Sequence, residues 1–452
     1  MNFLFDEKRK AYKEIMVIGI PSILESLVVA FTSIVDSKMV SVLGVKTISA
    51  VAITVQPRLL IISLFLALDI VISSLVAKYF GEKNQDSANE LLKKVLITVS
   101  VLSILFSILP IIFARPILIA FANQPDTIND SVIYFQILMA GMIFNTVYLA
   151  INAAFVGFGK TNITFVGGVI NFIVNVTFNY LLIEGRYGFP ALGVKGAAIA
   201  TVLSYIATMT YSLIMLLNKN NFINLPYMLS HNFNNNDGMY KELAVRTKNT
   251  YIDKLAQRLS IFMIAALVAR IGSLQMAVYS VCMHLFNIGF SFGTGAQTAA
   301  VALLGKAYGA KDNEGIKLYK DCVVNFTLAI SIILLAAIVF SRHWFIGLFS
   351  DEQEFVKLGE ISCIIVGVIT LFQSMKYPYL GSLQGLGKMK EVMYTTIVSF
   401  SFVNIIALIV LVVILKTGLY GVWISSFLSQ IVQGTMAYHY VNKSINNLSR
   451  GA

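Results

Sequence analysis

Uninterrupted apolar stretches of about twenty residues recur along the whole chain, and they constrain its fold more than any other feature. Each stretch is long enough to cross ~30 Å of hydrocarbon as a helix. The stretches are too long and too continuous for barrel strands, and in lipid the backbone polar groups must be satisfied internally. The sequence therefore predicts an all-α polytopic membrane protein with 12 transmembrane helices, at residues 14–40, 50–77, 91–114, 131–155, 162–183, 193–217, 247–270, 277–304, 318–341, 355–382, 391–415 and 419–441.

The composition and charge agree with this class. Hydrophobic residues make up 57% of the chain and charged residues 13%, whereas soluble domains carry about 25% charged residues. The net charge of +11 is unevenly distributed: the termini and the loops after even-numbered helices hold about twice as many Lys and Arg residues as the opposite side. By the positive-inside rule, both termini are expected in the cytoplasm, so the basic charge indicates topology in the cytoplasmic (inner) membrane and no nucleic-acid partner.

An internal repeat divides the chain. At an offset of 228 residues, Gly44 aligns with Gly272, Lys83 with Lys311, and the acid Glu25 with Asp253. Each half has an even number of helices, so the two halves are expected to form parallel six-helix lobes. We expect an N-terminal lobe at 1–217, a cytoplasmic linker at 218–246, which is the one long polar stretch, and a C-terminal lobe at 247–452.

Acidic residues inside the first helix are candidates for function, because a charge at mid-membrane costs ~2.5–3.5 kcal/mol. Glu25 and Asp36 are 11 residues apart and share a helical face. Pro21 removes a backbone hydrogen bond and predicts a bend. These features suit a protonation-driven switch, although Asp36 could instead pair with Lys38 at the interface.

Amide side chains form a polar stripe on the fifth predicted helix. Asn171, Asn175 and Asn179 follow one another at four-residue spacing and therefore lie on one face. They can bond a neighbouring helix, or they can hold the proton or a cation at Asp36.

Other polar groups within the membrane are secondary candidates. Asp253 and Gln257 share a face of the seventh helix and could form a cation site or a structural ion cluster. Asp69 lies deep in the second helix, and its repeat counterpart is Gln297. The lone His284 and Lys376 are more typical of hydrogen-bonded structure.

Aromatic and methionine side chains are abundant, and such faces suit flat, apolar, cationic ligands. The candidates for lining a substrate site are Phe31, Tyr134, Met139, Phe144 and Tyr148.

The sequence contains no constellation typical of an enzyme. The Gly157-x-Gly159-Lys160 turn lacks P-loop spacing, and no Ser/His/Asp, HExxH or CxxC arrangement occurs. Cys282, Cys322 and Cys363 are too far apart for a disulfide framework or a metal site. We therefore expect no enzyme, no cofactor and no bound metal, and an ion gradient as the source of energy.

Longer segments carry a family resemblance. IVDSKMVSVLGVKTISAVAI, LVAKYFGEKNQDSA with its second copy LLGKAYGAKDNEG, and VINFIVNVTFNYLLIEGRYGFPALGVKGAAIAT are similar to segments of the multidrug and toxic compound extrusion (MATE) family, and within it of the DinF-like branch. The resemblance covers nearly all of residues 10–442. It implies export of drug-like, often cationic compounds in exchange for protons or sodium ions.

The resemblance also assigns a coupling cluster. It implies that Asp36, Asn171, Asn175 and Thr201 form the cation-coupling site, to which the polar stripe adds Asn179. Many members have an aspartate where this chain has Asn175, so Asp36 is the only acid of this cluster. The seventh-helix acid associated with sodium in some members could correspond to Asp253.

Two alternatives to a monomeric antiporter for small organic compounds stay open. A flippase for a lipid-linked precursor would need a large cationic groove, which the few intramembrane Lys and Arg residues disfavour. A non-transporting membrane receptor would show no ion-driven flux.

Overall fold

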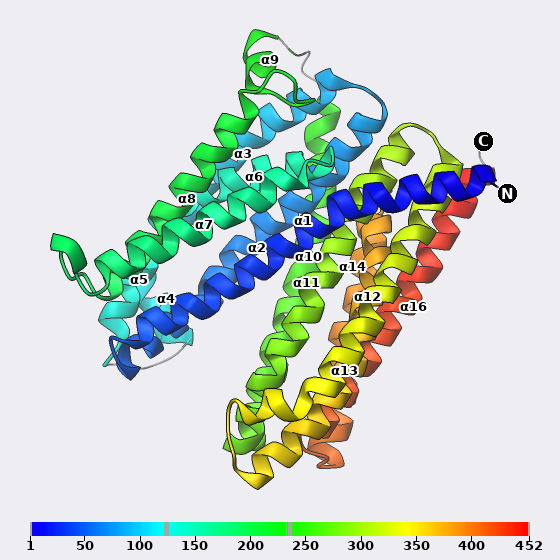
Figure 1. Ribbon diagram of the computed structural model, residues 1–452. Coiled ribbons are helices and arrows are strands. Elements are labelled where there is room, and N and C mark those ends of the chain that lie inside the picture. The colour runs from blue at the N-terminus through cyan, green and yellow to red at the C-terminus, as the bar shows by residue number, and fades with distance from the viewer. Residues whose placement is uncertain (1, 122–125, 232, 234–236, 451–452) are drawn as a thin grey trace. The chain divides into compact units, whose positions relative to one another are not determined.

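The computed structural model describes residues 2–121, 126–231, 233 and 237–450. Within these ranges the ordered secondary structure is helical throughout, without a β-strand, which confirms the predicted all-α class (Figure 1).

The chain forms two compact units. The N-unit comprises Leu24–Thr247, and the C-unit comprises Met1–Ile23 together with Lys248–Ala452. This division differs from the predicted lobes, because residues up to Ile23 group with the C-terminal helices and the described residues of the linker 218–246 group with the N-unit. The reason for the first difference is apolar burial: Ala11, Ile15 and Ile18 belong to one core cluster with Ala299 and Leu303.

Helix α1 (Asn2–Ser41) continues through Pro21 and passes from the C-unit into the N-unit at Ile23–Leu24. The Ser22 hydroxyl donates to the Ile18 carbonyl oxygen at 3.0 Å beside the proline. The other helices of the N-unit are α2 (Val45–Gly81), α3 (Gln85–Ile112), α4 (Ala114–Phe121), α5 (Ile128–Ala140), α6 (Met142–Gly157), α7 (Thr161–Leu182), the short 3₁₀ turn η1 (Arg186–Gly188), α8 (Val194–Leu216) and α9 (Leu225–Ser230).

Helix α10 (Asp237–Ile271) enters the C-unit at Lys248. It is followed by α11 (Ser273–Gly309), α12 (Asn313–Gly347), α13 (Gln353–Gly385), α14 (Met389–Thr396), the π-helical η2 (Ile397–Asn404), α15 (Ile405–Leu408), the π-helical η3 (Ile409–Ile414) and α16 (Leu419–Arg450).

Nine helices in the described part of the chain are long and apolar enough to cross a membrane, and α5 with α6, bent by 45°, form a tenth. Helices α10 and α16 are 35 and 32 residues long but more polar. Lys254 and Arg258 lower the hydropathy of α10, and several Ser and Gln residues lower that of α16. With these two, the described residues contain the twelve long helical segments that the sequence predicts.

The repeat extends to backbone conformation. Lys83 after α2 and Lys311 after α11 have positive φ angles of 55° and 57°. In each copy the next residue caps the following helix: Asn84 accepts from the Ser87 amide at 3.0 Å, and Asp312 accepts from the Gly315 amide at 2.8 Å. Two equivalent glycines, Gly159 and Gly387, have φ angles of 80° and 74°. The aligned glycines and lysines therefore mark equivalent turns.

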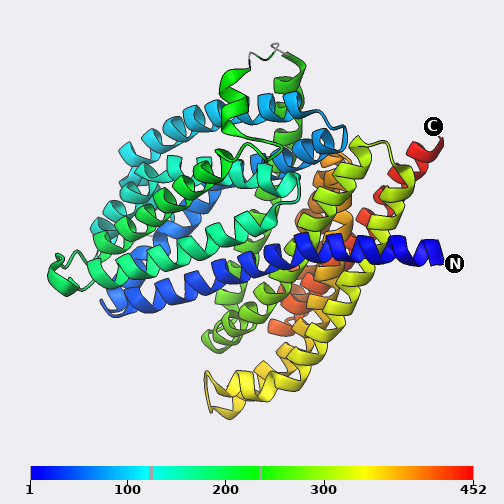
Figure 2. The same cartoon turned by 45° about the horizontal axis from the view of Figure 1, so that its top comes forward.

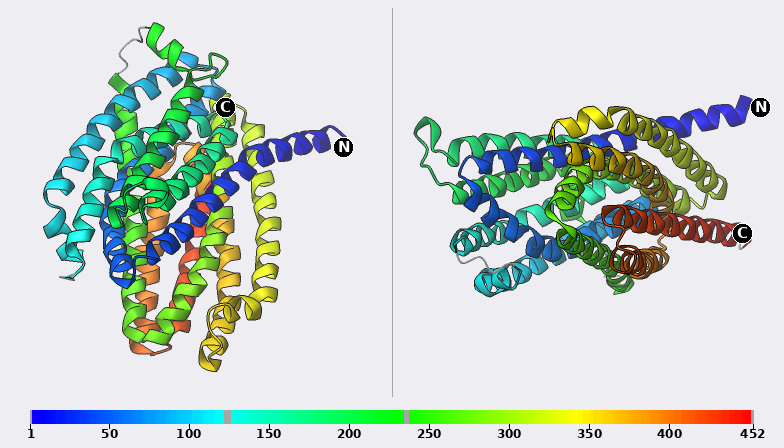
Figure 3. Two further views of the ribbon diagram at one scale, coloured as in Figure 1. Left: turned by 60° about the vertical axis from the view of Figure 1, so that its left-hand side comes forward. Right: turned by 90° about the horizontal axis from the view of Figure 1, so that it is seen from below.

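Helices that are close in the sequence pack together within each unit. In the N-unit, α7 and α8 lie side by side (Figures 1 and 2). In the C-unit, η2 and α16, coloured orange and red, pack against each other (Figure 3). Helices α7 and α8 carry the asparagine and threonine side chains near Asp36, and α16 carries Gln433.

The polar segment after α8 is anchored to α3. Asn89 donates to the Phe222 carbonyl oxygen at 3.1 Å and accepts from the Asn224 amide at 3.0 Å. Lys93 donates to the Met228 carbonyl oxygen at 3.2 Å, and the Tyr227 hydroxyl donates to Asp86. The described part of this segment is therefore a packed extension of the N-unit.

Candidate functional site

A chain of hydrogen bonds links Asp36 on α1 to α7 and α8. Asn179 Nδ2 donates to Asp36 Oδ1 at 2.6 Å and to Asn175 Oδ1 at 3.0 Å. Asn175 Nδ2 in turn donates to Thr201 Oγ1 at 3.4 Å. Both amide side chains are only 1% exposed. The structure therefore brings together four of the predicted coupling residues.

The third amide of the stripe is one step removed from this network. Asn171 donates to Ser204 Oγ at 3.2 Å, and Ser204 donates to the Thr201 carbonyl oxygen at 2.7 Å. Asn171 thus supports α8 beside Thr201, and within the described part of the chain its side chain does not bond Asp36 directly.

Two further groups belong to the surroundings of Asp36. Arg58 on α2 interacts electrostatically with Asp36. Tyr134 on α5 hydrogen-bonds with Thr201 and interacts with both Asp36 and Arg58. Sequence reasoning placed Tyr134 among substrate-lining candidates and missed Arg58. Arg58 follows Pro57 within an apolar helix, and a basic residue at that depth is a signal that could have found it.

Glu25 forms a second polar centre in the N-unit. Asn152 Nδ2 on α6 lies 3.1 Å from Glu25 Oε1, and Thr164 Oγ1 on α7 lies 2.7 Å from Glu25 Oε2. Asn152 Nδ2 also lies 3.4 Å from the Tyr148 hydroxyl. Gly168 on α7 lies beside the acid, and a Cβ atom there would be in van der Waals contact with Glu25 Cγ at 3.4 Å. Asp69 interacts electrostatically with Tyr148, so it belongs to the edge of this centre.

Asp253 on α10 is the C-unit acid that aligns with Glu25, and it is 1% exposed. It accepts hydrogen bonds from Gln257 Nε2 at 3.1 Å and from the Thr396 hydroxyl. Thr396 accepts from Gln433 Nε2 at 2.8 Å, and Gln433 Oε1 accepts from Lys376 Nζ at 2.6 Å. A continuous series of hydrogen bonds therefore runs from the lysine ammonium group to the carboxylate.

Lys376 is held within the C-unit by more than this bond. It is 4% exposed, and its Nζ lies 4.9 Å from the centre of the Phe400 ring and 5.2 Å from that of Tyr377. Such positions over aromatic faces stabilise a desolvated cation.

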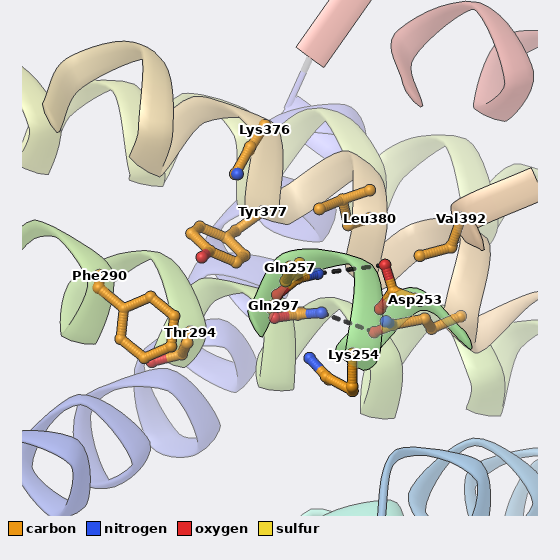
Figure 4. A pocket seen from close by; sticks show the side chains of 11 residues that line it. Asp253, Lys254, Gln257, Phe290, Thr294, Gln297, Lys376, Tyr377, Leu380 and Val392 are labelled. Atoms are coloured by element: carbon orange, nitrogen blue, oxygen red, sulfur yellow. Dashed lines mark hydrogen bonds between the residues drawn. The ribbon is translucent and has the colours of Figure 1, made fainter. Parts of the chain in front are cut away.

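Asp253, Gln257, Lys376 and Tyr377 line a cavity of about 40 Å³ (Figure 4). A cavity of this volume has room for a few water molecules or a small ion, and not for an organic substrate. The other lining residues are Lys254, Phe290, Thr294, Gln297, Leu380, Gln384 and Val392.

The substrate-lining candidates differ in burial. Tyr134, Met139 and Tyr148 are buried in the N-unit core. Phe31 is 55% exposed and packs against Phe172 with ring centres 5.5 Å apart, and Phe144 is half-buried. Their contact with a substrate stays a prediction.

The fold and its polar centres define a class of protein. A multi-pass helical chain with an internal repeat and hydrogen-bonded acids inside apolar helices is typical of membrane transporters.

Comparison with known proteins identifies the family. The model of the MatE family matches residues 21–181 and 251–410, one match in each repeat. The chain is 22% identical to the uncharacterized transporter YisQ of Bacillus subtilis, over 92% of this chain and 91% of that protein. It is 20% identical to the probable multidrug resistance protein NorM of Thermotoga maritima, over 95% of this chain and 92% of that protein.

A solved structure has the same fold. It is described as the outward-facing conformation of a multidrug resistance MATE family transporter of the MOP superfamily. It superposes with a TM-score of 0.90 at 19% identity and covers 97% of both chains. The chain therefore belongs to the MATE family of multi-pass membrane transporters, and it is not an enzyme. Its place in the DinF-like branch stays a prediction.

Proposed function

We propose that the protein is a secondary antiporter that exports drug-like, cationic organic compounds across the cytoplasmic membrane in exchange for protons, with sodium as the second candidate ion. The names of relatives support the cargo class, since several are described as multidrug resistance proteins. The proposed form is a monomer with both termini in the cytoplasm.

The observation that carries the proposed coupling is the bonding pattern of Asn179. Its amide nitrogen donates to both Asp36 and Asn175, which uses both of its hydrogens. Its Oδ1 is a buried acceptor without a hydrogen-bond partner in the described structure. A buried acceptor left unpaired costs about 1–3 kcal/mol. A protonated carboxyl or a small cation bound at Asp36 is the kind of group that would remove this cost.

The proposed cycle couples occupancy of Asp36 to the shape of the N-unit. When Asp36 binds a cation, its hydrogen bonds to α7 rearrange, and α1 is the helix that responds. Pro21 lies in the same helix and weakens its backbone hydrogen bonding, so α1 can change its bend there. Each end state would differ in its affinity for the exported compound, as an exchange mechanism requires.

The test measures efflux of ethidium, a fluorescent organic cation, from proteoliposomes under separate proton and sodium gradients. Wild-type protein should export ethidium under the proton gradient, and Asp36→Asn should lose most of this efflux. Asp130→Asn, which changes an exposed acid of the same unit, serves as the control and should behave as wild type.

Unchanged efflux and unchanged pH dependence in Asp36→Asn would rule out the proposed coupling by this residue. Efflux driven by sodium alone would replace the proton with sodium. Absence of flux under either gradient would favour a non-transporting receptor.

A further inference from the structure

We infer that Glu25 is a second, separate proton-binding site of the N-unit. At the equivalent acid of the C-unit, Asp253, the side chain of Lys376 supplies the positive charge in place of that proton. The ligand at Glu25 is a proton, held among neutral side chains of α6 and α7.

The two contacts of the Thr164 hydroxyl indicate the protonation state of Glu25. The Thr164 hydroxyl lies 2.7 Å from Glu25 Oε2 and 2.8 Å from the Thr161 carbonyl oxygen. A hydroxyl has one hydrogen but can accept others, and a carbonyl oxygen can only accept. If Thr164 donates to Thr161, the contact with Glu25 needs a hydrogen carried by Glu25 itself. A protonated Glu25 is therefore the form that satisfies both contacts.

The charges around Glu25 give the second step. Its contacts among the described residues are with neutral groups, the Asn152 amide and the Thr164 hydroxyl, and no ion pair joins it to a basic side chain. Tyr148 on α6 interacts electrostatically with Glu25, and it also interacts with Asp69 on α2 and Tyr211 on α8. None of these three groups supplies a positive charge. A buried carboxylate without a counter-ion is strongly disfavoured, and a proton neutralises it.

The repeat gives the third step, because the same position in the C-unit is built differently. Lys376 stands at the position of Tyr148, and Thr396 at that of Gly168. Leu380 and Val392 replace the two residues that contact Glu25, Asn152 and Thr164. The polar contacts of the N-unit acid are thus absent at the equivalent positions, where a lysine is added instead.

Hydrogen counting in the C-unit gives the opposite charge state. Lys376 donates to Gln433, Gln433 to Thr396, and Thr396 to Asp253. Lys376, Gln433 and Thr396 each supply the hydrogen of one bond in this series, and Asp253 accepts the last bond without a hydrogen of its own. The negative charge of Asp253 is therefore compensated by a positive charge tethered to the chain, that of Lys376. Glu25 is instead compensated by a proton that can exchange.

The experiment is infrared difference spectroscopy of the full-length protein in vesicles of phosphatidylcholine and phosphatidylglycerol, in sodium-free buffer. The wild type should show the carbonyl band of a protonated carboxyl at neutral pH. Glu25→Gln should lose this band, whereas Asp36→Asn and Asp253→Asn should retain it. Exchanging the choline chloride of this sodium-free buffer for sodium chloride should leave the carbonyl band unchanged.

A second variant guards against misfolding. Thr164→Val has the side-chain shape of the original and introduces the Val that the C-unit has at this position. It removes the hydroxyl partner, so the carboxyl band should move to higher frequency without disappearing. Identical spectra for wild type, Glu25→Gln and Thr164→Val would overturn the inference, and so would loss of the band on adding sodium. Because no exported compound is used, failure of ethidium transport would leave this result standing.

Discussion

In the N-unit, Glu25 is surrounded by neutral amide and hydroxyl groups, whereas in the C-unit Asp253 shares its surroundings with the ammonium group of Lys376. Both acids occupy the same position of the repeat. A buried charge can be compensated by a bound ion or by a side chain of opposite charge. The two repeats therefore share a scaffold and differ in whether the compensating charge can leave.

The Asp36 network extends this contrast. Its acid aligns with Ile264 in the second repeat, and Asn175 aligns with Val403. The C-unit thus has apolar side chains where the N-unit has a carboxylate bonded to amides. Both exchangeable centres that we propose lie in the N-unit, and the C-unit retains one internally neutralised acid.

The largest effect is expected from removing the tethered charge. Lys376→Met keeps the length of the side chain but leaves Gln433 Oε1 without its donor, and it removes one of the two lysine charges that act on Asp253, the other being that of Lys254. Because Lys376 is linked to Asp253 only through Gln433 and Thr396, the loss should approach but not exceed the ~3 kcal/mol of breaking a direct buried ion pair. Thermal unfolding of the purified protein should show a marked loss of stability.

A double-mutant cycle isolates the electrostatic part of this loss. Adding Asp253→Asn to Lys376→Met removes the uncompensated acid and should recover part of the stability. Tyr148→Phe, at the equivalent position of the N-unit, removes only a hydroxyl and should cost about 1 kcal/mol. Equal stability of the single and double variants would show that Lys376 does not compensate Asp253.

A smaller effect is expected from two equivalent glycines at close helix contacts. A Cβ atom at Gly157 would stand 2.7 Å from both the Ser73 carbonyl oxygen and Val76 Cβ, whereas at Gly385 the nearest backbone atoms are 3.0 Å away. Overpacking costs typically about 1–3 kcal/mol. The folded state should therefore be destabilised by about 2 kcal/mol in Gly157→Ala and by about 1 kcal/mol in Gly385→Ala. The reverse order would mean that the N-unit contact relaxes more easily.

The sequence predicts the helices and the repeat because both rest on local properties. Apolar length defines the spans, and Gly159, Gly387, Lys83 and Lys311 mark turns whose backbone needs are local. The four-residue spacing of Asn175 and Asn179 also placed them correctly on one face. The unit boundary within α1 was not predictable in this way, because it depends on which distant residues cover Ala11, Ile15 and Ile18.

The partners of the acids were harder to predict than the acids themselves. Asn152, Thr164 and Gly168 come from two helices far from Glu25 in sequence, and each residue type is common in membrane helices. Lys376 stood out as an intramembrane charge, but its connection to Asp253 runs through Gln433 and Thr396, which depend on helix packing.

The smallest effect is expected in the segment of the N-unit that contains α9 and follows α8. Tyr227 on this helix donates a hydrogen bond to Asp86 at the start of α3, and this bond raises the pKa of the tyrosine. Tyr227→Phe should reduce the unfolding free energy by about 0.5 kcal/mol. Because the folded-state pKa is raised, the contribution is fully present below the ordinary tyrosine pKa and is lost as the pH rises through the folded-state value. Stability of wild type and variant should therefore differ at neutral pH and converge at strongly alkaline pH. A constant difference across this range would show that Tyr227 anchors the segment by packing alone.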